Sequence, residues 1–114
     1  MKKIAVAVKD NGKKLEHFGV CEIFIVYDYD DGTHIVEYSD IVYSSKDRHG
    51  SEEWEKSADS ISECDIVICE KIGLKAKAEV EARGIKVIET DGSIEEVLDN
   101  FIDSEIRKSS VVLP

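Results

Sequence analysis

The chain has 114 residues, the usual size of one domain, and a formal net charge of -10. Its hydrophobic fraction of 42% is enough for a buried core, so neither a disulfide nor a metal ion is needed merely for folding. The acidic charge argues against nucleic acid as a partner, because a phosphate backbone is bound by basic surfaces. We therefore expect a single domain over residues 1–114 that does not bind nucleic acid.

Targeting and membrane signals are not recognisable in the sequence. The basic start is followed only by the apolar run of residues 4–8, which is too short for the core of a secretory signal. No apolar stretch has the length of a membrane span. The three cysteines are an odd number, which indicates free thiols in a reducing compartment. We therefore expect a cytoplasmic protein without membrane association.

Hydrophobic periodicity predicts the element order βββαβαβα. The strands are expected where apolar and β-branched residues dominate, at residues 4–8, 22–29, 33–43, 65–69 and 85–88. A hairpin turn at residues 30–32 joins the second strand to the third, with Gly32 expected to take the positive φ. The βαβαβ pattern of the second half requires parallel strands with right-handed crossovers. The predicted fold is α/β: a mixed five-stranded sheet in the order 3-2-1-4-5, with strand 2 antiparallel and helices on both faces.

The helix boundaries follow from local signals. Ser51 can cap the first helix, and Gly84 can end the second in a left-handed conformation. Ser93 and Glu96 form a capping box at the start of the third helix. Residues 104–114 are expected to fray, because the apolar stripe of that helix stops before them.

Chemistry is expected at the carboxyl ends of the parallel strands, where ligands bind in open sheets of this kind. His17 and Cys21 flank the turn after the first strand, Cys69 ends the fourth, and His49 follows the third. Imidazole and thiolate form a soft ligand set that suits iron–sulfur species, zinc or copper. The spacings match no closed zinc site, so an open set that holds a preassembled cluster through a few bonds is expected.

Each of these residues also has a purely structural interpretation. Cys21 and Cys64 can be small buried hydrophobic residues, and His17 can be a polar loop residue. Phe18 is expected to anchor the loop in the core, and His34 to lie on a solvated strand face. Gly19 and Gly73 are expected to allow tight turns. Gly73, at the start of a helix, can also expose backbone N–H groups to an anion.

Other chemistries have weaker support. The sequence contains no G-x-G-x-x-G, P-loop or G-x-S-x-G motif, so nucleotide-binding and hydrolase interpretations lack their signatures. A magnesium-dependent nuclease would need several carboxylates, for which only Asp10 and Glu70 are suitably placed.

The sequence resembles the dinitrogenase iron–molybdenum cofactor biosynthesis family, which includes NifX-like proteins and the C-terminal domain of NifB. The matching segments cover nearly the full chain: KIAVAVKD, HFG before an aromatic-rich strand, DIVICEKIG, GIKVIET and SIEEVL. His49-Gly50 is similar to the histidine–glycine element of the family, without the additional glycines often found there. The chain resembles the short stand-alone members, which are frequent in methanogens and other anaerobes.

The resemblance implies a ribonuclease H-like fold and a carrier without enzymatic activity. The expected cargo is an iron–sulfur or iron–molybdenum-type cluster, passed between cofactor-assembly proteins. The residues expected to contact the cluster are His17, Phe18, Gly19, Cys69 and Gly73, and the expected metal ligands are His17, Cys69, Cys21 and His49. A regulatory or protein-interaction module that has kept the fold and binds no metal remains the alternative.

Overall fold

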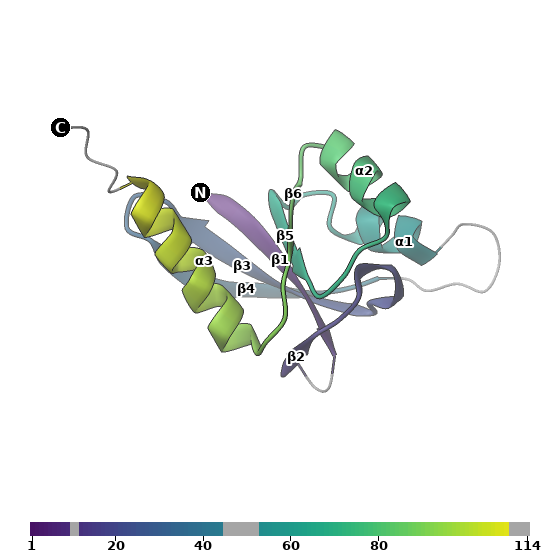
Figure 1. The fold of residues 1–114 in the computed structure, drawn as a ribbon, viewed down its shortest axis with the longest axis horizontal. Coiled ribbons are helices and arrows are strands. Elements are labelled where there is room, and N and C mark those ends of the chain that lie inside the picture. Colours follow the sequence, from purple (N-terminus) through teal and green to yellow (C-terminus); the bar gives the residue numbers. More distant parts are fainter. Residues whose placement is uncertain (10–11, 45–52, 110–114) are drawn as a thin grey trace.

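The computed structural model describes residues 1–9, 12–44 and 53–109, and Figure 1 shows their arrangement. The expectations for Asp10, His49 and Ser51 fall outside these residues. The strands are β1 (Lys2–Lys9), β2 (Lys14–Leu15), β3 (Ile23–Asp30), β4 (Ile35–Tyr43), β5 (Ile66–Cys69) and β6 (Lys86–Glu89). The helices are η1, a short 3-10 helix (Phe18–Val20), α1 (Glu53–Ser60), α2 (Leu74–Ala82) and α3 (Ile94–Ser109).

The strands form one mixed sheet in the order β4-β3-β1-β5-β6. β3 is antiparallel to both neighbours, pairing Val6 with Ile25 of β3 on one side and forming the β3–β4 hairpin on the other. β1, β5 and β6 are parallel, as their helical connections require. The sheet has six strands and not the five expected, because β2 pairs with the end of β1 through Val8 and Leu15. Two residues are too few to give a periodic signal in the sequence.

The helices cover both faces of the sheet, with α1 and α2 on one side and α3 on the other (Figure 1). The alternation of side chains along the strands therefore builds two cores. One core, which includes Phe18, Phe24 and Val67, packs under α1 and α2. The second core, which includes Tyr29 and Phe101, packs under α3. Within the described ranges, no helix combines the length and the apolar character that a bilayer crossing demands.

Two helix ends follow the local rules that the sequence predicts. Gly84 has φ +88°, and the amides of Gly84 and Ile85 bond back to Glu81 and Val80, which closes α2. At the start of α3, Ser93 Oγ accepts from the Glu96 amide at 3.1 Å, while Glu96 Oε1 accepts from the Ser93 amide at 3.2 Å. The expected fraying of the tail from residue 104 is wrong for its first part, because α3 continues to Ser109.

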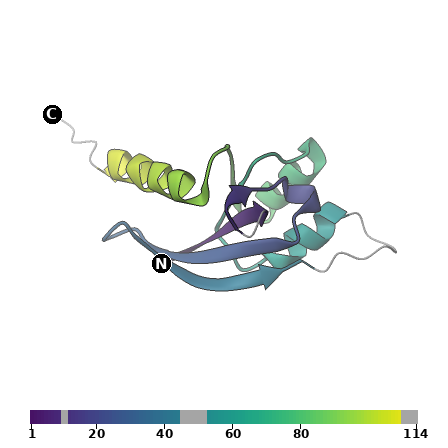
Figure 2. The same cartoon turned by 90° about the horizontal axis from the view of Figure 1, so that it is seen from below.

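The hairpin between β3 and β4 differs from the expected turn. The positive φ belongs to His34, at +59°, and not to Gly32. His34 lies in the turn before β4 and is half-buried, with its Nδ1 at 2.8 Å from the hydroxyl of the fully buried Tyr29. The expectation that His34 is a solvated strand residue is therefore wrong. Figure 2 shows this turn near the C-terminal end of α3. The Tyr29 ring packs edge-on against Phe101 of α3, with the ring centroids 5.0 Å apart.

Replacing Ser93 with Ala should lower the free energy of unfolding by about 1 kcal/mol, because α3 loses its N-cap acceptor. Urea unfolding followed by circular dichroism measures this loss. Ser104→Ala, an exposed serine inside the same helix, is the control and should leave stability unchanged within about 0.5 kcal/mol. Equal stabilities of the two variants would contradict the capping role.

Candidate functional site

Two backbone hydrogen bonds join the loop after β2 to the segment that leaves β5. The Glu70 amide donates to the Glu16 carbonyl at 2.9 Å, and the Phe18 amide donates to the Lys71 carbonyl at 2.8 Å. The residue between the two bonded positions on the loop is His17. Its backbone is therefore held at the carboxyl ends of β1 and β5, the edge at which the sequence predicts a ligand site.

The side chain of His17 faces solvent and is paired with Glu70. The imidazole Nε2 lies 3.0 Å from Glu70 Oε1, and the two side chains are 48% and 33% exposed. A carboxylate can only accept a hydrogen bond, so Nε2 is the protonated ring nitrogen in this pair. The lone pair then lies on Nδ1. A histidine whose second nitrogen donates to a carboxylate is the usual arrangement of a metal ligand in proteins.

Phe18 anchors this loop, as the sequence predicts. Its side chain is fully buried, with the ring centroid 5.9 Å from that of Phe24. Gly19 follows within η1, where an added Cβ would lie 3.9 Å from Trp54 Cβ, an ordinary contact distance. The chain does turn tightly here, because the Cys21 amide donates to the Phe18 carbonyl at 3.3 Å. Gly19 is not among the residues with positive φ, so its backbone angles do not require glycine.

The cysteines are not open to a ligand. Cys69 is 0% exposed, and its burial, with a further contribution from Glu89, raises the pKa of the thiol to about 12. Burial raises the pKa of Cys64 to about 11. Cys21 is also buried in the core under α1 and α2, and its Sγ lies 2.9 Å from the Ile23 carbonyl oxygen. Because the thiolate is the ligand form of cysteine, the expectation of an open imidazole–thiolate set is not met.

The geometry of β5 explains why His17 meets Glu70 and not Cys69. Successive side chains of an extended chain point to opposite sides. Cys69 points into the core, and Glu70 points outward to the imidazole. Glu70 was missed as the partner of His17, although its position directly after a buried strand was a usable signal. No group of three His, Cys, Asp or Glu residues that could hold a metal ion occurs within residues 1–9, 12–44 and 53–109.

Gly73 lies on the segment bonded to this loop and is the N-cap of α2. Its φ of -67° is ordinary, so glycine is not required there for a tight turn. It provides no side-chain cap, and the space around a Cβ at this position is open to beyond 4 Å. The first amides of α2 thus receive no cap from Gly73, at a helix terminus that carries partial positive charge.

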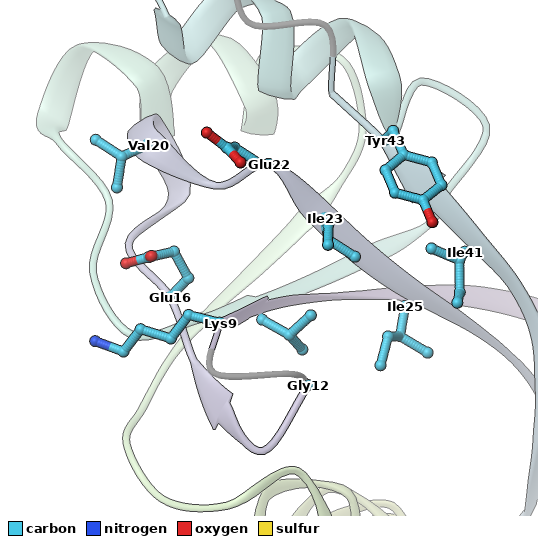
Figure 3. A pocket seen from close by; sticks show the side chains of 10 residues that line it. Lys9, Gly12, Glu16, Val20, Glu22, Ile23, Ile25, Ile41 and Tyr43 are labelled. Atoms are coloured by element: carbon cyan, nitrogen blue, oxygen red, sulfur yellow. The ribbon is translucent and has the colours of Figure 1, made fainter.

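A separate groove of about 670 Å³ lies on the α3 side of β1, β3 and β4. Figure 3 shows the apolar side chains of Ile23, Ile25, Ile41 and Tyr43 along it, with Glu16 across from them. The residues that line the groove include neither His17 nor a cysteine. The groove and the His17–Glu70 pair are therefore distinct features.

Fold and geometry define a small α/β domain with a solvent-facing His17–Glu70 pair at the carboxyl ends of the parallel strands of a mixed sheet. The sequence matches the family model for the dinitrogenase iron-molybdenum cofactor over residues 1–104, and the chain belongs to this family. A comparison with curated proteins finds no significant match.

Several solved structures share the fold. PH0822 is similar with a TM-score of 0.72, 21% identity and coverage of 90% of both chains. The apo form of the orange protein from Desulfovibrio gigas gives a TM-score of 0.66 and 24% identity, covering 92% of this chain and 90% of that one. A candidate NifB protein from Thermotoga gives 0.62 and 25%, with the same coverage.

The buried Cys69 thiol should make stability depend on alkaline pH. Its folded-state pKa of about 12 exceeds the ordinary value of 9.0, so its contribution is complete below pH 9 and is lost as the pH rises toward 12. Between pH 8 and pH 10, the free energy of unfolding should fall by roughly 1 kcal/mol more in the native protein than in Cys69→Ala.

Chemical unfolding at the two pH values measures this difference. Val67→Ala provides a matched control, because Val67 is buried in the same strand and does not titrate. It should retain the pH dependence of the native protein. A Cys69→Ala variant with that same pH dependence would show that the thiol is accessible in the folded state.

Proposed function

We propose that the protein is a non-enzymatic carrier that binds an iron–sulfur or iron–molybdenum-type cluster through His17 and passes it to assembly proteins. The observation that carries the proposal is the solvent-facing imidazole of His17, paired with Glu70 at the carboxyl edge of the sheet. Membership of the dinitrogenase iron-molybdenum cofactor family supports a cluster as the cargo. The ribonuclease H-like interpretation of the fold and a cytoplasmic location belong to the same proposal.

The ligand atom in this proposal is Nδ1 of His17. Glu70 accepts the proton of Nε2, which fixes the tautomer and increases the basicity of the nitrogen that faces the metal. Both backbone neighbours of His17 are fixed by hydrogen bonds to the β5 exit, so the imidazole is oriented before the cluster arrives. Glu70 is a positioning residue, because it acts through the ring of His17.

A single open ligand suits a protein that must release its cargo. The thiols of Cys21 and Cys69 are buried in the core under α1 and α2, so the structure does not present them to solvent beside the imidazole. A cluster bound through one imidazole exchanges more readily than one held by four thiolates. The ligand roles of Cys21, Cys69 and His49 remain predictions from the sequence.

The net charge of -10 does not attract an anionic cluster from a distance. Local groups must offset it. The start of α2 at Gly73, which lacks a cap from the Gly73 side, and the exposed Lys71 lie on the segment that bonds to Phe18, next to His17 along the loop. Amides at a helix terminus favour negative charge, which supports Gly73 as a second contact of the cargo.

The matched pair His17→Gln and His34→Gln tests the ligand. Each substitution removes one imidazole and keeps a side-chain amide for hydrogen bonding. When isolated iron–molybdenum cofactor is added without oxygen, the native protein and His34→Gln should show equal charge-transfer absorption after gel filtration. His17→Gln should lose most of it. Equal loading of His17→Gln would contradict His17 as the ligand, and a native protein that takes up no cofactor would favour the protein-interaction alternative.

Glu70→Gln tests the positioning role. The amide can donate to Nε2, which favours the tautomer whose proton is on Nδ1 and removes the proposed ligand lone pair. Cluster affinity should fall about tenfold, with a change of tautomer visible in the imidazole ¹⁵N spectrum. Glu79→Gln removes the same charge from the pair with Arg83 and should do neither. A tautomer unchanged in Glu70→Gln would contradict the proposed role.

A further inference from the structure

β4 is an edge strand that exposes an apolar row. Tyr38, Ile41 and Tyr43 are 61%, 39% and 70% exposed. They face the same side of the sheet, because they pair with Tyr27, Ile25 and Ile23, which alternate along β3. Tyr38 joins this row only through the register shift opposite Val26 and Tyr27, which leaves one extra residue in β4. Without that bulge, Tyr38 and Ile41 would lie on opposite faces.

The apolar row borders the groove of about 670 Å³, whose floor is formed by Val8, Ile23 and Ile25. α3 covers the other end of this face, where it packs on Tyr29. The groove is thus the part of this sheet face that α3 leaves open. Ile41 and Tyr43 lie along one side of it (Figure 3). A cleft of this size with mainly apolar walls can receive several side chains of a partner.

The backbone of β4 is also open along its outer edge. Its inner edge pairs with β3, and no strand in the described part of the chain pairs on the other side. The amide of Ile41 donates to Asp40 Oδ1 at 2.8 Å and not to a strand. An edge of this kind can accept an extended segment, with main-chain bonds supplying affinity and alternate side chains supplying specificity.

The charges around this edge select the chemistry of the partner. Glu37 and Asp40 lie on the face of β4 opposite the apolar row and are exposed. Glu16 and Glu22 line the groove, against a single lysine, Lys9. A second copy of the chain would bring these carboxylates and its own net charge of -10 against them, which disfavours self-association.

We propose that β4 and the adjoining groove form a docking surface for an extended protein segment that alternates apolar and basic side chains. The apolar side chains pack on Tyr38, Ile41 and Tyr43, and the basic ones lie on the opposite face beside Glu37 and Asp40. Apolar and basic residues alternate one by one in this segment, because paired residues of neighbouring strands point to the same face of the sheet. This inference is independent of the proposed cargo, since the groove is distinct from the His17–Glu70 pair.

The test uses fluorescently labelled ten-residue peptides and the full chain, with anisotropy as the measurement. The probe peptide alternates Lys and Val. Two controls alternate Glu and Val, or Lys and Ser. The protein variants are Ile41→Ser/Tyr43→Ser for the apolar row, Glu37→Lys/Asp40→Lys for the charged face, and Leu74→Ser as a control at an exposed apolar residue of α2. Circular dichroism verifies that each variant folds.

The Lys–Val peptide should bind best to the native protein and to Leu74→Ser. Each double variant should weaken it by about tenfold or more, and Glu37→Lys/Asp40→Lys should gain affinity for the Glu–Val peptide. Amide exchange at Ile41 and Tyr43 should slow in the complex. Equal binding of the Lys–Ser peptide, equal binding by the apolar-row variant, or a dimer formed through this row in sedimentation would each overturn the proposal.

Discussion

The candidate site depends on two backbone hydrogen bonds: the Glu70 amide donates to the Glu16 carbonyl, and the Phe18 amide donates to the Lys71 carbonyl. They attach the loop after β2 to the exit of β5, at distances of 2.9 and 2.8 Å. Without them, His17 would sit on a loop connecting β2 to η1, and its imidazole would sample many orientations. With them, it faces Glu70. The burial of Phe18 supplies the hydrophobic contribution that keeps the same loop against the core.

The two faces of the sheet differ in what their cores bury. The core under α1 and α2 encloses all three free thiols, so they are not available as ligands at the surface. α3 does not cover the whole of its side of the sheet. It leaves open the end at which β1 ends, β3 begins and β4 ends. That gap leaves an apolar groove in an otherwise acidic protein. The proposed cargo site and the proposed docking surface therefore lie at separate places.

Much of the fold follows from local sequence signals. The buried strands, the hairpin, Gly84 at the end of α2 and the Ser93–Glu96 capping box all act within a few residues, so they are legible in the sequence. β2 is too short to have a period, and the local pattern favours Gly32 over His34 for the positive φ of the turn. The full length of α3 was missed because its last turns carry few apolar residues.

The site was harder to predict than the fold. The sequence places His17 and Cys69 at the same edge of the sheet, and the edge is correct. The direction of each side chain at that edge depends on the pleat of the strand. Moving one residue along the strand turns a side chain from the core to the solvent. Cys69 falls on the core side and Glu70 on the open side. The groove beside β4 depends on how far α3 extends across the sheet, which no local pattern encodes.

The most direct test of the carrier hypothesis is the imidazole ¹⁵N spectrum of histidine-labelled protein before and after loading with isolated iron–molybdenum cofactor in the absence of oxygen. The proposal predicts that the Nδ1 signal of His17 shifts or broadens beyond detection, while the signals of His34 stay in place. An unchanged His17 in a protein that has bound the cluster would contradict the assignment of this imidazole as the ligand.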